Sequence, residues 1–263
     1  MRIPYEDRFA DLEPLLARVE KPSRYIDHEW GTLSKDDADY RACLIYPDTY
    51  EVGLPNQGIA ILYNVLNKQE GISCERGYVP WVDMADAMRE AGVPLLSLEG
   101  AAPVASFDVV GFHVPHEMAC TNYLEAMDLA GIPFYSADRG EDDPIIIAGG
   151  PSVYNPEPLA PFFDAILIGE GEESIVEVCR EHQRLRDAGA TRQEILRGLA
   201  RVAGTYVPSL YEIKYDEPCT EHGYAVPREG EDVPEVVYKR VVEDFGATDP
   251  LSQSVIPYAQ LVH

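Results

Sequence analysis

The sequence lacks the features that mark a membrane or exported protein. None of its apolar runs reaches the roughly 18 residues that a membrane-spanning helix needs. The N-terminus, Met1-Arg-Ile-Pro-Tyr5, has neither the apolar core nor the cleavage site of a signal peptide. We therefore expect a globular, cytoplasmic protein with no membrane partner.

Basic residues and closely spaced cysteines are also scarce. The 263 residues include 21 Lys and Arg against 46 Asp and Glu, a formal net charge of −25. Such an acidic protein repels phosphate backbones, so we expect no nucleic-acid partner; a salty cytoplasm would also account for the acidity. The five cysteines lack the C-x-x-C and C-x-x-x-C-x-x-C spacings that bind zinc or an iron-sulfur cluster. Their positions predict buried thiols.

Catalytic constellations are missing as well. The sequence has no recognisable Ser/His/Asp, Cys/His or paired-carboxylate arrangement and no P-loop, so we predict no catalytic residue in this chain. Potential metal ligands gather only at His113, His116, Glu117 and Cys120. Because their spacing matches no standard ligand set, we predict a polar lining there and no metal site.

Short apolar runs alternate with helical patterns along most of the chain. Strands are predicted at 41–46, 72–79, 94–98, 108–113, 145–148 and 165–168, and helices at 59–67, 81–91, 121–130 and 173–186. This alternation predicts a doubly wound α/β fold with a mostly parallel sheet, of the Rossmann or flavodoxin type.

Three regions follow from this pattern. Residues 1–39 read as an N-terminal helical arm, and 40–203 as the α/β domain. Residues 204–263 read as a β-rich extension, with strands predicted near 205–215, 234–242 and 254–263.

Two predicted strands end abruptly in glycines. Ile145-Ile-Ile-Ala-Gly-Gly-Pro151 and Ala165-Ile-Leu-Ile-Gly-Glu-Gly-Glu172 place these turns at the carboxyl edge of the sheet, where open α/β sheets bind ligands. Gly149 and Gly150 have no Cβ and so allow a bulky ligand close to the backbone, and Gly169 allows a tight turn into a helix. The chain therefore reads as a ligand-binding domain.

Four runs identify a family that the chain resembles: 46–54 (YPDTYEVGL), 108–112 (DVVGF), 148–151 (AGGP) and 169–172 (GEGE). They are similar to the N-terminal cobalamin-binding region of radical S-adenosylmethionine (SAM) proteins. The resemblance implies a cobalamin-binding fold and cobalamin as the cofactor. It also implies that the partner is a radical SAM domain later in the same polypeptide, which holds the [4Fe-4S] cluster and SAM. This chain would then not be catalytic alone.

The resemblance also points to individual residues, with two departures. Cobalamin domains carry D-x-H-x-x-G after the first strand, whereas this chain has Asp48-Thr-Tyr50-Glu-Val-Gly53. A phenol with a pKa of roughly 10 is a poor cobalt ligand, so any cobalamin here should lack an imidazole from the Tyr50 position. His113-Val-Pro115 replaces a serine-bearing strand end. The implied ligand-lining residues are Asp48, Tyr50, Gly53, His113, Gly149, Gly150 and Pro151, with Gly169 and Glu170 next.

Two other interpretations remain open. In one, the domain has lost its ligand and docks on the radical SAM barrel as a scaffold, with Asp48 capping a turn and Tyr50 filling the core. In the other, it is a flavodoxin-like binder of a nucleotide or flavin. The carboxylates of Glu170 and Glu172 at a predicted helix start disfavour the second, because they repel a phosphate.

Overall fold

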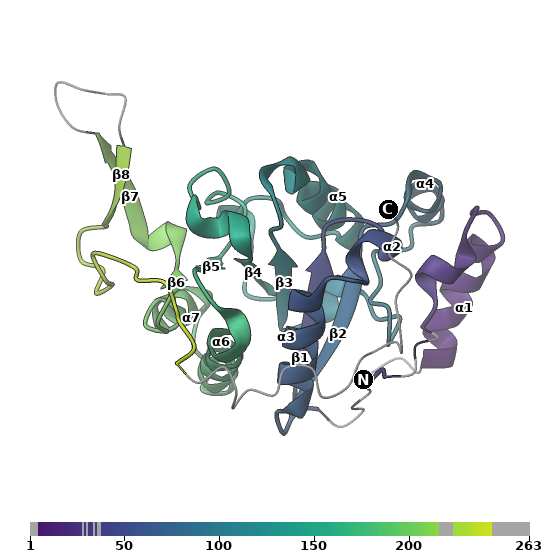
Figure 1. Ribbon diagram of the computed structural model, residues 1–263, viewed down its shortest axis with the longest axis horizontal. Coiled ribbons are helices and arrows are strands. Elements are labelled where there is room, and N and C mark those ends of the chain that lie inside the picture. The colour runs from purple at the N-terminus through teal and green to yellow at the C-terminus, as the bar shows by residue number, and fades with distance from the viewer. Residues whose placement is uncertain are drawn as a thin grey trace.

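The computed structural model describes residues 5–27, 29, 31–33, 35, 38–215 and 223–243, and these form an α/β sandwich (Figure 1). The main sheet has the strand order β2-β1-β3-β4-β5-β6. Its strands are β1 (Tyr40–Tyr46), β2 (Ile72–Tyr78), β3 (Val109–His113), β4 (Ile145–Gly149), β5 (Ala165–Leu167) and β6 (Thr205–Tyr206). The first five run parallel and β6 is antiparallel, so the predicted doubly wound, mostly parallel sheet is confirmed.

Helices cover both faces of this sheet. They are α1 (Tyr5–Leu16), α2 (Tyr50–Gly53), α3 (Gln57–Lys68), α4 (Val82–Ala91), α5 (Cys120–Ala130), α6 (Gly171–Asp187) and α7 (Arg192–Leu199). On one face α3 packs against α6, which also contacts α7, and on the other α4 packs against α5 and α1. No helix in the described ranges is long and apolar enough to cross a membrane.

The connections create a switch point between β1 and β3. The chain passes from β1 to β2 on one side and then returns to β3 on the other side of β1. Loops that leave these two strands in opposite directions open a crevice at the carboxyl edge, where ligands bind in folds of this kind. The strands are almost fully buried, which fits their continuous apolar runs.

Two predicted strands are wrong. Residues 94–98 form only an isolated bridge between Leu96 and Pro103, because Leu95 bonds Leu129 and Val104 in place of a strand partner. Residues 234–242 pair only at Arg240, with Gly169. The strand predicted at 254–263 lies outside the described residues.

The region after α6 holds an additional helix and a hairpin. The helix α7 was not predicted, although Thr191 and Glu194 form a capping box whose T-x-x-E spacing is visible in the sequence. After β6 has joined the main sheet, β7 (Tyr211–Tyr215) and β8 (Gly223–Pro227) pair as a separate antiparallel hairpin that projects from the body (Figure 1).

Candidate functional site

A cavity of about 200 Å³ opens at the carboxyl edge of the sheet, between the sheet, α3 and the start of α6. We call this cavity the slot. Its side walls are mainly apolar, from Leu44, Ile59, Leu62, Ile147, Leu167 and Ile175. Strands β1 and β3 both contribute, so the slot lies at the switch point.

Glycines keep the β4 side of the slot open. Gly150 has φ +130°, and a Cβ there would lie 2.8 Å from the carbonyl oxygen of Val114, so only glycine fits. Gly149, by contrast, has room: the nearest atoms to a Cβ there belong to Leu167, 3.9 Å away. Gly150 is thus required by the turn itself, whereas Gly149 leaves space at the wall.

His113, at the end of β3, places a polar group among the apolar walls of the slot. Its ring stacks on Tyr46, with centroids 5.4 Å apart and planes 20° apart. Its Nε2 lies 3.5 Å from Nδ2 of Asn56, whose Oδ1 accepts the amide of Ile59 at the start of α3. Burial lowers the pKa of His113 to about 4, so the imidazole is neutral at pH 7.

The opposite rim is the turn from β5 into α6. Gly169, Glu170 and Glu172 line the slot there, and Glu172 and Glu173 occupy the first turn of α6, where carboxylates are favoured by the helix dipole. The backbone N–H of Glu170 donates to the carbonyl of Arg240 over 3.0 Å. This helix start is therefore acidic, and the backbone amide that precedes it is already engaged.

Tyr50 does not line the slot. Its hydroxyl donates to Oε1 of Glu29 over 2.6 Å, and its ring meets Tyr78 edge-on, with centroids 5.3 Å apart. Burial and the Glu29 carboxylate both raise the pKa of Tyr50, so the phenol stays protonated. The tyrosine at the position where cobalamin domains carry histidine thus faces the N-terminal arm.

Glu29 belongs to a buried ionic network that sequence reasoning missed. Its second oxygen lies 2.5 Å from Nη2 of Arg76, and the Nε and backbone N of Arg76 donate to the two oxygens of Glu99 over 2.6 Å each. Burial raises the pKa of Glu99 to about 7, against the opposing effect of Arg76. Only the fold brings together residues 29, 76 and 99, so no local pattern could have signalled this network.

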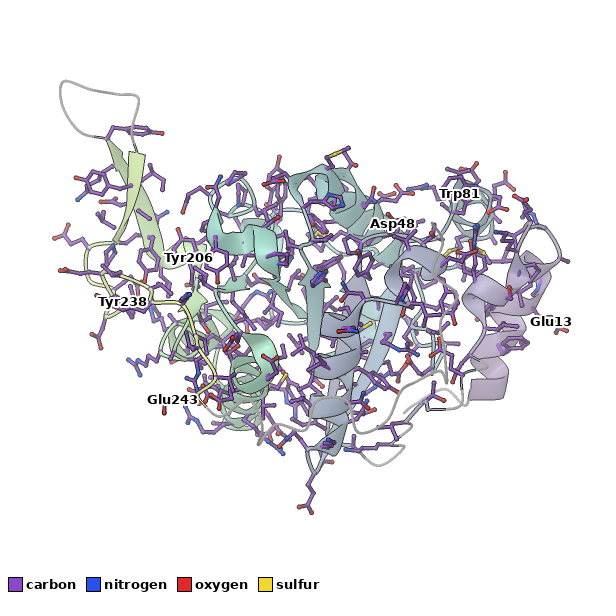
Figure 2. All side chains as sticks on the ribbon, in the orientation of Figure 1. Glu13, Asp48, Trp81, Tyr206, Tyr238 and Glu243 are labelled. Carbon is purple, nitrogen blue, oxygen red and sulfur yellow. The ribbon has the colours of Figure 1, made fainter. Side chains whose placement is uncertain are left out.

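The remaining predicted residues lie outside the slot. Oδ1 of Asp48 accepts the amide of Thr49 over 2.7 Å, and Asp48 and Trp81 line a separate open groove at the same edge (Figure 2). A Cβ on Gly53 would lie 2.6 Å from the ring of Tyr78, so this glycine permits close packing. Pro151 is exposed and begins a 3₁₀ turn. Five of the nine predicted residues thus line the slot: His113, Gly149, Gly150, Gly169 and Glu170.

The potential metal ligands after β3 do not form a centre. In the part of the chain that the structure describes, no three His, Cys, Asp or Glu residues are placed to hold a metal ion. His116 and Glu117 are exposed, and Cys120 begins α5.

Comparison with known proteins assigns the family. The family model described as "Radical SAM proteins, N-terminal" matches residues 58–208, more than half of the 263 residues. The match begins within α3 and continues past β6, and so includes every wall of the slot except that of β1. No curated protein matches the chain. The chain therefore belongs to the family of N-terminal regions of radical SAM proteins.

Proposed function

We propose that this accessory domain of a radical SAM protein binds cobalamin at the carboxyl edge of its sheet. In this proposal the heteroaromatic base of the nucleotide tail enters the slot, and the corrin lies over the strand ends. The observation that carries the proposal is the slot itself, a narrow apolar cavity beside glycine turns at the switch point. Such a cavity suits a flat, mostly apolar ring.

The polar group in the slot fits the same ligand. His113 is neutral at pH 7, so one of its ring nitrogens carries a proton and the other a lone pair. An N–H of this imidazole can therefore donate to a nitrogen of the heteroaromatic base. This contact would replace that of the serine in the family pattern.

Cobalt would find no protein ligand in the loop after β1. The Tyr50 hydroxyl is used by Glu29, and its raised pKa disfavours the phenolate that a metal would need. We therefore expect the cobalamin to bind without a protein imidazole from this position and with its own base removed from cobalt. A corrin bound in this way supplies a transferable methyl group or redox assistance to the linked radical SAM domain, which holds the [4Fe-4S] cluster and SAM.

A nucleotide or flavin mononucleotide fits the edge less well, because its terminal phosphate carries more negative charge than the phosphodiester in the cobalamin tail. Phosphates bind at helix starts with free backbone amides and no nearby anions. Here Glu170 and Glu172 line the rim, the Glu170 amide is engaged by Arg240, and Asn56 caps the start of α3.

A scaffold that has lost its ligand is the stronger alternative, because Asp48 and Tyr50 make the local contacts expected of a turn cap and a packed aromatic. It predicts no cofactor uptake at all.

Titration of the purified chain with hydroxocobalamin tests the proposal. We expect one equivalent to bind, to co-elute in gel filtration and to show the visible spectrum of cobalamin whose base has left cobalt. Gly149→Val should narrow the slot and abolish uptake, whereas Gly140→Val, at an exposed glycine with its nearest neighbour 3.9 Å from a Cβ, should not. Absence of binding at high micromolar cofactor would favour the scaffold, and uptake of flavin mononucleotide alone would favour the flavin binder.

A further inference from the structure

A segment late in the chain lies against the rim of the slot. Residues 238–242, which we call the strap, run beside the start of α6, and Figure 2 labels Tyr238 at one end and Glu243 just beyond the other. The Arg240 amide donates to the carbonyl of Ile168 over 2.8 Å, and the Arg240 carbonyl accepts the amide of Glu170 over 3.0 Å. The Val242 amide donates to the carboxylate of Glu170. The strap therefore holds both the backbone and the side chain of a residue that lines the slot.

The backbone at Gly169 is shaped by this contact. Gly169 has φ +108°, and a Cβ there would lie 2.2 Å from the carbonyl oxygen of Arg240. Gly204, with φ +81°, faces the same residue: a Cβ there would lie 3.1 Å from that of Arg240. Glycines from the turn after β5 and from the turn before β6 thus leave room for the strap, so the fold itself provides the space in which the strap lies.

Ion pairs between Arg240 and α6 also hold the strap in place. Nη2 of Arg240 lies 2.6 Å from a carboxylate oxygen of Glu173 and 2.9 Å from one of Glu177, both on α6. These ion pairs place a cation beside the acidic turn that forms the rim. Loss of Arg240 would leave the carboxylates to repel one another and any anionic part of a ligand.

We infer that the strap is a positioning element for the slot: when docked it holds Glu170 at the rim and retains the ligand, and when released it opens that side. The inference rests on the proposed function for the identity of the ligand. The strap follows the family-matched region, on the side of the chain that leads to the linked radical SAM domain. Movement of that domain would then displace Arg240 and so change the position of Glu170 at the rim of the slot.

The attachment suits such a coupling. Among the described residues it comprises a single bridge, one bond to a carboxylate, partly exposed ion pairs and one buried side chain, that of Val242. Because these contacts are few, we place the strap in the less stable part of the fold. Linkage then requires reciprocity: if docking retains the ligand, the bound ligand must protect the strap to the same degree.

Hydrogen exchange of the strap and rim amides, with hydroxocobalamin as the probe, tests the coupling. We expect Arg240→Ala to speed exchange of the Glu170 and Val242 amides and to weaken cobalamin binding, each about fivefold, as for loss of a partly exposed ion-pair network. Lys239→Ala removes an exposed neighbouring cation and should change neither. Gly169→Ala should release the strap more fully, by about 30-fold, because of the backbone strain. Thermal unfolding checks that each variant is folded.

If the wild-type chain binds cobalamin, two outcomes overturn the inference. One is faster strap exchange in Arg240→Ala with unchanged cobalamin affinity, and the other is unchanged exchange. If the wild-type chain takes up no cobalamin, the proposed function is rejected, but the coupling between slot and strap can still be tested without ligand. The side chain of Gly149→Val then occupies the slot and should slow strap exchange relative to Gly140→Val. Equal exchange in these two variants would overturn the inference.

Discussion

The two halves of the carboxyl edge use their polar groups differently. In the half formed by the loops after β1 and β2, the Tyr50 hydroxyl, the Glu29 carboxylate and the Arg76 guanidinium bond one another. In the half formed by β3, β4 and β5, apolar walls and glycines surround a cavity in which His113 stacks on Tyr46 and makes a long contact to Asn56. The loop after β1 thus uses its side chains in contacts within the fold, while the cavity in which we propose that cobalamin binds lies among the walls of the slot.

We expect the largest effect on stability when Arg76, the cation of the buried network, is replaced. Arg76→Ala would leave Glu29 and Glu99 buried without their shared cation, and we expect the free energy of unfolding to fall by about 3–5 kcal/mol. Urea unfolding measures this loss. Arg89→Ala, which removes exposed ion pairs with Glu125 and Asp128, is the control and should cost about 1 kcal/mol or less. Equal losses would show that the network is not structural.

Valine substitutions at the adjacent Gly149 and Gly150 separate loss of binding from loss of stability. Gly150→Val adds backbone strain and a contact with Val114, so we expect about 1–3 kcal/mol of lost stability together with loss of cobalamin binding. Gly149→Val should abolish binding with a smaller loss of stability, because a Cβ there has room. Thermal unfolding and cobalamin titration of both variants separate strain from steric exclusion. Binding by Gly149→Val would contradict the placement of the ligand.

The two halves should also respond oppositely to pH. The pKa of Glu99, about 7, is raised, so the folded state holds a proton that the unfolded chain loses near 4.5; stability from this group falls as pH rises from 4.5 to 7. The pKa of His113, about 4, is lowered from 6.5, so its contribution is present above 6.5 and is lost as pH falls toward 4.

Unfolding free energies measured from pH 4 to 8 check both signs. Glu99→Gln should reduce the falling component, to which Asp27 also contributes because burial raises its pKa; the variant lowers stability at every pH because its amide faces a donor of Arg76. His113→Phe should reduce the rising component, to which His182 also contributes because burial lowers its pKa to about 4 as well. A profile that neither substitution alters would contradict both assignments.

The sheet, its carboxyl edge and the glycine turns could be predicted from the sequence, because each depends on a pattern of neighbouring residues. Apolar runs that end in glycine identified β4 and β5, and the alternation of strands and helices predicted the mostly parallel sheet. The network of Glu29, Arg76 and Glu99 could not be read in the same way, because its members are far apart in sequence. The contact between the strap and Gly169 could not be predicted for the same reason. Gly169 has the sequence position of a helix-start glycine, but its conformation is required by Arg240, 71 residues later.

The smallest expected effect on cofactor binding concerns Tyr50. Tyr50→Phe removes one hydrogen bond to a buried carboxylate, for a loss of about 1–3 kcal/mol in stability, and should leave cobalamin affinity and spectrum unchanged. Tyr50→His introduces the histidine of the D-x-H-x-x-G pattern of cobalamin domains, yet α2 directs this position toward Glu29 and Tyr78, so the imidazole should pair with the Glu29 carboxylate and not with cobalt. The visible spectrum of the bound cofactor separates these outcomes. Imidazole-ligated cobalt in Tyr50→His would mean that the loop after β1 rearranges on binding, and that the two halves of the edge act together.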